Sequence, residues 1–98
     1  MKSPAEIIEL MLAGDAFSNG LGMEVLHIEP GKCKIRMQVN EGMVNGFKIA
    51  HGGITYALAD SAMAFASNAH GFQCVSIETA ISHIKKVHIN DVLTASCT

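Results

Sequence analysis

The sequence predicts an α+β fold, and three stretches of the chain carry that prediction. Residues 32–39 and 74–84 alternate apolar and polar side chains with a period of two, as half-buried antiparallel strands do. Residues 53–68 lie between them and are rich in alanine, the strongest helix former. A chain of 98 residues has the length of one domain, so we expect a single domain, 1–98, with a central and almost wholly buried helix.

The segment before the first strand is predicted to hold a short helix over 3–12. Ser3 is a favourable cap, Pro4 suits the first helical position, and Glu6 follows the cap at the spacing of a capping box. The apolar residues that then share one helix face are Ile7, Ile8, Met11 and Leu12. Gly14 is expected to end this helix.

A β-hairpin is expected next, preceded by a turn at 19–22. A strand over 23–28 leads through a tight turn at 29–32 into the first alternating run. Its apolar face consists of Cys33, Ile35, Met37 and Val39, and its polar, basic face of Lys32, Lys34, Arg36 and Gln38. Residues 41–50 have no period and contain two glycines, which indicates a loop.

The second half of the chain is predicted to follow the central helix with strands. The helix should end at His70-Gly71, and the alternating run over 74–84 comes next. A polar turn over 85–91 precedes a strand that begins at 92–95. Because the chain ends soon after this strand begins, we expect a natural or engineered truncation.

Composition limits the partners that this chain can have. It contains 7 Lys+Arg and 9 Asp+Glu, a formal charge of −2, and it is 49% hydrophobic and 16% charged. These values are typical of a globular protein, and they provide no positive field for nucleic acid. We therefore expect no nucleic-acid partner, and an anionic ligand would need a local basic cluster.

Several features predict a soluble, cytoplasmic protein. No apolar run approaches the roughly 20 residues of a membrane helix, and Glu6 and Glu9 interrupt the stretch that a secretion signal would need. Cys33, Cys74 and Cys97 are an odd, widely spaced set, which suits a reducing compartment and buried thiols.

Asp60 stands out within the alanine-rich helix because its helical neighbours are almost all uncharged. Burying a carboxylate without a partner costs several kcal/mol, so its presence needs an explanation. One interpretation places Asp60 on an exposed strip of the helix, or bonded to Tyr56 or Ser67 of the same helix. The functional interpretation is a carboxylate made reactive by burial and available as a general base or nucleophile.

A second cluster lies over 45–53, at the predicted start of the same helix. Gly52 and Gly53 follow His51 there, and glycines at a helix start let a substrate approach the backbone. The free amides of a first turn, with the helix dipole behind them, stabilise a developing oxyanion. The simpler alternative is that the glycines only permit a tight turn into the helix.

Spacing separates these two candidate sites within one chain. Gly52 and Asp60 are eight residues apart, which is about 12 Å along a helix that rises ~1.5 Å per residue. A carbonyl bonded to the Gly52 amide cannot also reach Asp60 of the same chain. If both act on one substrate, Asp60 must come from another subunit, and a two-fold dimer with antiparallel central helices would provide two such sites.

The combination of Asn45, His51-Gly52-Gly53 and Leu58-Ala59-Asp60 on an alanine-rich helix resembles the hotdog-fold acyl-CoA thioesterases. It is most similar to those of the phenylacetate-degradation type. The order of elements is similar too, with an N-terminal helix, a hairpin, a loop and a central helix. The resemblance covers the whole chain, and it implies an antiparallel sheet wrapped around that helix, here lacking its C-terminal strands.

The resemblance also implies roles for individual positions. Asp60 would be the general base or nucleophile, and Gly52 would provide the oxyanion amide. Asn45 would orient the attacking water or the thioester, and His51 would position the loop and the acyl carbonyl. Ser76, on the strand after the helix, corresponds to a hydroxyl residue that sometimes orients the water.

The chain departs from the family pattern after its long strand. The family usually has an Arg-Pro or similar pair there and a glycine before the next aspartate, but this chain has Lys85-Lys86 and Asn90-Asp91. Lys85 and Lys86, with His83 and His88, form the main basic cluster, which could meet coenzyme A phosphates or be a solvated turn. No histidine pair has a convincing metal-ligand spacing with a carboxylate, so no metal is expected.

The leading expectation is hydrolysis of an aryl-acetyl-CoA or medium-chain acyl-CoA by a homodimer, or by a tetramer built from two dimers. The acyl group would lie against Met43, Phe47 and Tyr56, beside Gly53, and no cofactor is expected other than the coenzyme A of the substrate. Two alternatives remain open. One is hydration of an enoyl thioester, which hotdog folds also host, and the other is a non-catalytic acyl-CoA-binding or structural dimer.

Overall fold

The structure is a computed structural model and describes residues 2–71 and 85–98. Its elements in chain order are α1 (Pro4–Ala13), α2 (Ala16–Gly20), β1 (Glu24–Glu29), β2 (Lys32–Gln38), the short 3₁₀ turn η1 (Glu41–Met43), α3 (Gly52–Asn68) and β3 (Val92–Cys97). The strand predicted over 74–84, which would carry Ser76, lies outside the described residues. Among the described residues, no helix has the length and apolar character needed to cross a membrane.

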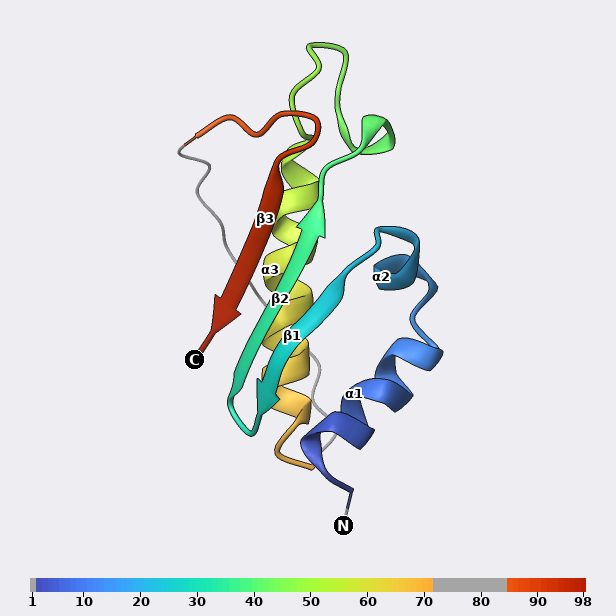
Figure 1. Cartoon of the computed structure of the whole chain (residues 1–98), viewed down its shortest axis with the longest axis vertical. Coiled ribbons are helices and arrows are strands. Elements are labelled where there is room, and N and C mark those ends of the chain that lie inside the picture. Colours follow the sequence, from blue (N-terminus) through green and yellow to red (C-terminus); the bar gives the residue numbers. More distant parts are fainter. Residues whose placement is uncertain (1, 72–84) are drawn as a thin grey trace.

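The three strands form one antiparallel sheet in the order β1-β2-β3, and α3 packs along one face of it (Figure 1). The period-two prediction for β2 is confirmed, since alternate residues are buried and the residues between them are exposed. The buried residues are Cys33, Ile35 and Met37 of β2, followed by Val39 directly after the strand. They pack with Leu58, Ala62, Phe65 and Ala66 of α3 to form the core of the predicted α+β architecture.

The N-terminal helix begins with the predicted capping box. The Glu6 amide donates to Ser3 Oγ at 3.2 Å, and the Ser3 amide donates to Glu6 Oε1 at 3.1 Å. Pro4 occupies the first helical turn, and Gly14 caps the other end. These local signals lie within a few residues of one another, so they could be recognised without knowledge of the tertiary structure.

The turn predicted at 19–22 is wrong for its first half, because Asn19 and Gly20 belong to a short helix, whereas Leu21 and Gly22 form a turn as predicted. α2 begins after Asp15, whose Oδ1 accepts the Ser18 amide at 2.9 Å. Asn19 Nδ2 donates to the Leu12 carbonyl at 2.6 Å and fastens α2 to the end of α1. A five-residue helix is too short to show a hydrophobic period, so capping and tertiary contacts have to stabilise it.

The central helix is buried on one side only, which corrects the expectation of an almost wholly buried helix. α3 begins at Gly52, one residue earlier than predicted, because His51 is its cap. Gly52, Gly53 and Ala59 are exposed, whereas the residues that face the sheet are buried. The sheet covers one side of α3, and the side turned towards α1 and α2 lines a groove.

The tip of the β1–β2 hairpin packs against the C-terminal end of α3. Gly31 has a φ of +78°, and its amide donates to the Ala66 carbonyl at 3.0 Å. The His70 ring lies so close that a Cβ at position 31 would be 3.1 Å from its Nε2. The turn therefore needs glycine both for its backbone conformation and for this close contact.

Strands β2 and β3 place two cysteines opposite each other. Cys33 pairs with Cys97 in the antiparallel register, and both are free thiols. Burial, with a smaller contribution from the neighbouring Cys97, raises the pKa of the Cys33 thiol to about 11. Cys33 therefore stays protonated at neutral pH and behaves as the buried apolar thiol that the sequence indicated.

Candidate active site

A groove with a volume of about 660 Å³ runs along α3 on the side that faces α1 and α2. Gly52, Tyr56, Asp60 and Ala64 line it at intervals of one helical turn. α1 and α2 contribute the opposite wall, which includes Phe17. The groove thus extends past both the N-terminal amides of α3 and the carboxylate of Asp60.

Asp60 is half-buried at the side of this groove. No hydrogen bond or ion pair connects its carboxylate to another residue in the described part of the chain. In particular, the bond to Tyr56 or Ser67 considered from the sequence is not formed there. A half-buried carboxylate that faces a groove without a partner is available to a bound molecule, which favours the functional interpretation of this residue.

The first turn of α3 leaves one amide available and uses another internally. His51 Nδ1 accepts the Gly53 amide at 3.1 Å, and the amide of His51 itself donates to the Met43 carbonyl at 2.8 Å. The Gly52 amide meets no acceptor among the described residues. Gly52 is therefore the better candidate for an oxyanion donor, while His51 is hydrogen-bonded to Met43 and Gly53, and its role towards the loop and the acyl carbonyl stays a prediction.

Asn45 shapes the loop that precedes α3. Its Oδ1 accepts the amides of Phe47 at 2.9 Å and Ile49 at 3.3 Å, while its own amide donates to the Ile49 carbonyl at 2.8 Å. Lys48, at the tip of this loop, has a φ of +62°. The oxygen of the Asn45 side chain is thus engaged within the loop, which gives Asn45 a structural role. Its predicted role in orienting the attacking water or the thioester stays a prediction.

The structure does not bring together the three residues expected around the acyl group. Met43 is only 2% exposed in the core, and Phe47 is 85% exposed at the loop. Tyr56 lines the groove, as does Gly53. Opposite α3, the lining of the groove comes from α1 and α2 and includes Phe17. The sequence did not predict this, because its local pattern gave no indication of which helices pack beside α3.

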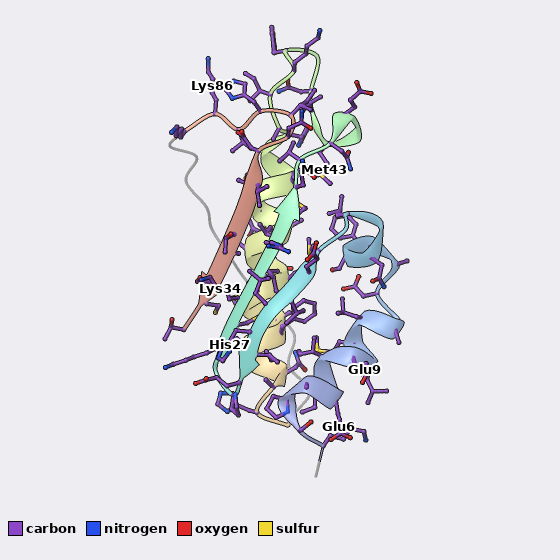
Figure 2. The ribbon with its side chains drawn as sticks, viewed as in Figure 1. Glu6, Glu9, His27, Lys34, Met43 and Lys86 are labelled. Carbon is purple, nitrogen blue, oxygen red and sulfur yellow. The ribbon has the colours of Figure 1, made fainter. Side chains whose placement is uncertain are left out.

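Lys85 and Lys86 lie beside the N-terminus of α3, in a second hollow of about 290 Å³. The Ala50 amide donates to the Val87 carbonyl at 2.7 Å and holds their segment against the loop before α3. Figure 2 shows Lys86 at the same end of the molecule as Met43. Gly52 lines both this hollow and the groove. A molecule that extends from the groove over Gly52 would therefore enter the hollow and lie beside the two lysines.

Sequence reasoning missed a polar cluster at the wall of the groove. Asp15, Ser18 and Ser61 all line it, although Ser18 is only 1% exposed. The one available signal was the spacing of Asp15 and Ser18, which is that of a helix cap and the residue it binds. The contact between Ser18 and Ser61 joins α2 to α3, and no local pattern could have indicated it.

Comparison with known proteins places this arrangement in a family. Residues 47–98, which include α3 and β3, match the thioesterase superfamily. A protein of Escherichia coli strain K12 named acyl-coenzyme A thioesterase PaaI is 33% identical over 86 residues, which are 88% of this chain and 61% of that protein. A putative esterase of Archaeoglobus fulgidus is 33% identical over 87 residues, 89% of this chain and 56% of the relative.

The chain belongs to the thioesterase superfamily. It spans less than two thirds of the length of these two curated relatives.

Solved structures agree with this placement. The E. coli PaaI protein from the phenylacetic acid degradation operon superposes with a TM-score of 0.91 at 30% identity, covering 95% of this chain and 67% of that chain. A mutant PaaI from Thermus thermophilus gives 0.80 at 34% identity, covering 84% and 70%. A hypothetical thioesterase protein of Streptococcus pneumoniae, solved with coenzyme A, shares the fold at 24% identity and a TM-score of 0.72, covering 76% of this chain and 58% of that chain. The predicted hotdog fold is confirmed.

Proposed function

We propose that the whole protein hydrolyses acyl-CoA thioesters to the free acid and coenzyme A. The observation that carries this proposal is the position of Asp60, a half-buried carboxylate without a partner among the described residues, in a groove that reaches the Gly52 amide. The lysine-lined hollow begins at the same glycine. Membership of the thioesterase superfamily and the likeness to E. coli PaaI support the reaction class.

In the proposed reaction, the oxygen of a water molecule bonds to the thioester carbonyl carbon, and the carbon–sulfur bond breaks. Asp60 accepts the proton of the water as a general base and returns it to the leaving sulfur. In the alternative route, the Asp60 carboxylate itself bonds to the carbonyl carbon and displaces the coenzyme A thiolate, and water then hydrolyses the resulting anhydride. The Gly52 amide holds the carbonyl oxygen as negative charge develops on it, aided by the dipole of α3. These steps need neither a metal nor a redox cofactor.

Each proposed site combines two copies of the chain. Gly52 and Asp60 line the same groove, but they lie eight residues apart on one helix, so about 12 Å separates them at ~1.5 Å per residue. One carbonyl group cannot contact both within a single chain. A two-fold axis that sets two α3 helices antiparallel brings Asp60 of one copy to Gly52 of the other, in a homodimer or in a tetramer of two dimers.

The groove and the hollow divide the proposed substrate into two parts. Phe17 and Tyr56 give the groove apolar walls, which suit an aryl-acetyl or medium-chain acyl group. Lys85 and Lys86 supply cations for the phosphates of coenzyme A. We place the enzyme in the cytoplasm, a proposal supported by the odd, widely spaced set of three cysteines, Cys33, Cys74 and Cys97.

The substitution Asp60→Asn tests the proposed function. The amide keeps the shape of the carboxylate but cannot accept a proton or attack a carbonyl, so kcat should fall by about 10²–10⁴-fold. Release of free thiol from phenylacetyl-CoA and from medium-chain acyl-CoA measures this, with circular dichroism to confirm the fold. Glu24→Gln, which removes a surface carboxylate paired with Arg36 at 2.9 Å, is the matched control and should keep wild-type activity. Turnover by Asp60→Asn within threefold of wild type would refute the assignment.

A further inference from the structure

A chain of hydrogen bonds leads from α2 to the groove and ends at the residue that follows Asp60. The side-chain oxygen of Ser18 lies 2.6 Å from Asp15 Oδ2 and 3.3 Å from the hydroxyl of Ser61. Ser18 is only 1% exposed, so both of its contacts are shielded from bulk water. Ser61 lies on α3 and lines the groove directly after Asp60.

The hydrogen-bonding capacity of each group fixes the direction of this chain. A carboxylate only accepts hydrogen bonds, so the single hydroxyl proton of Ser18 points to Asp15. Ser18 can then only accept from Ser61, whose own proton is thereby used. Ser61 consequently offers lone pairs, and no proton, to a molecule in the groove.

We propose that Ser61 is a positioning residue that holds the attacking water beside Asp60. The inference rests on the proposed hydrolysis in its general-base form. Asp60 accepts one hydrogen of the water and Ser61 accepts the other, so the oxygen lone pair is left free for the thioester carbonyl. A hydrogen-bond donor at position 61 would instead engage the lone pair that has to attack. Asp15 and Ser18 therefore act on the reaction indirectly, because they make Ser61 donate its proton to Ser18 and leave its lone pairs for the water.

Asp15→Asn reverses this direction while preserving the shape of the cluster. Asparagine caps a helix as well as aspartate does, so α2 keeps its start. Its amide nitrogen replaces the oxygen next to Ser18 and donates to that hydroxyl, which in turn donates to Ser61. The proton of Ser61 then points into the groove. We expect kcat to fall about tenfold while KM stays unchanged, since the loss affects a contact to water and not to substrate.

Two variants at position 61 separate the hydroxyl from the packing around it. Ser61→Ala removes the acceptor and should lower kcat by about the same factor as Asp15→Asn. Ser61→Thr keeps the hydroxyl and should retain kcat within about twofold of wild type. A rise in KM at constant kcat for Ser61→Ala would show that Ser61 contacts the acyl group instead, and would overturn the proposal.

Asn19→Ala is the control for a purely structural effect. It removes the bonds from Asn19 Nδ2 to the carbonyls of Leu12 at 2.6 Å and Asp15 at 3.0 Å, so it loosens α2 without altering the hydroxyl chain. We expect a lower Tm and an unchanged kcat. If this variant lowers kcat as much as Asp15→Asn does, the cluster only supports the fold.

Asp60→Asn, measured in the same thiol-release assay, keeps the two proposals apart. If that variant stays active, the proposed function fails. If it is inactive while Asp15→Asn keeps kcat within twofold of wild type, the proposed function stands and the role of Ser61 is refuted.

Discussion

At the scale of single residues, three glycines separate the cost of backbone conformation from the cost of crowding. A Cβ at Gly31, where φ is +78°, would lie 3.1 Å from the His70 ring. A Cβ at Gly22, where φ is +70°, would meet no atom within 4 Å, and Gly14 has neither constraint. A left-handed conformation costs a residue with a Cβ about 1–2 kcal/mol. We therefore predict that Gly22→Ala lowers the free energy of unfolding by about that amount.

Gly31→Ala should lower the free energy of unfolding by roughly 2–4 kcal/mol, because crowding against the His70 ring adds to the backbone cost. Gly14→Ala should leave the free energy of unfolding within about 0.5 kcal/mol of wild type. Urea unfolding of the three variants measures the series. The double variant Gly31→Ala/His70→Ala should recover the crowding part of the loss only. Equal losses at positions 22 and 31 would show that the contact with His70 costs nothing.

At the scale of elements, the loop before α3 and the segment before β3 together present Lys85 and Lys86 next to Gly52. We predict that replacing both lysines with alanine raises KM for an acyl-CoA about tenfold and leaves kcat nearly unchanged, because cations that hold the carrier do not contact the reacting carbonyl. The effect should shrink as salt is added, since salt screens exposed charges.

The control for this prediction replaces Lys32 and Lys34 with alanine. These lysines are exposed on β2 and do not line the hollow, so the control makes the same change in net charge elsewhere on the molecule. Figure 2 shows Lys34 away from Lys86. It should leave both kinetic constants near wild type. An unmoved KM for the Lys85/Lys86 variant at low salt would identify that cluster as a solvated turn.

The elements that sequence could predict are those whose signals are local. The capping box of α1 and the alternation of β2 each depend on neighbouring residues, and both are present as expected. α2 escaped prediction because five residues cannot show a period, and the open side of α3 escaped because alanine-rich helices do not reveal which elements pack on them. For the same reason the sequence pointed to Asp60 but not to Ser18 and Phe17, which line the same groove from α2.

At the scale of the whole molecule, the proposed two-copy site predicts that two inactive variants restore activity when mixed. Asp60→Asn removes the carboxylate. Gly52→Pro removes the amide proton at the first position of α3, where proline is well tolerated and where the ψ of 138° at His51 suits a following proline. Each variant alone should be inactive. In a mixed dimer, one site has both an intact Gly52 and an intact Asp60, so random reassociation should yield about a quarter of wild-type activity.

Denaturing the two variants together and refolding them measures this complementation by thiol release. Mixtures of each variant with itself, treated in the same way, are the controls. A mixture as inactive as its components, although native mass spectrometry shows mixed dimers, would place Gly52 and Asp60 in a single-chain site.

The pairing of β2 with β3 also bears on how the chain folds during synthesis. Cys33 lies opposite Cys97, so the chain has to be made as far as residue 97 before this part of the sheet can close, and closing so long a loop is slow. The β1–β2 hairpin and α3 are made earlier and can meet through the Gly31–Ala66 contact while the far edge of β2 still lacks its neighbour. For that interval the nascent protein exposes a strand edge with the capacity to pair with other chains, which makes this stage the one at which a chaperone would protect it most.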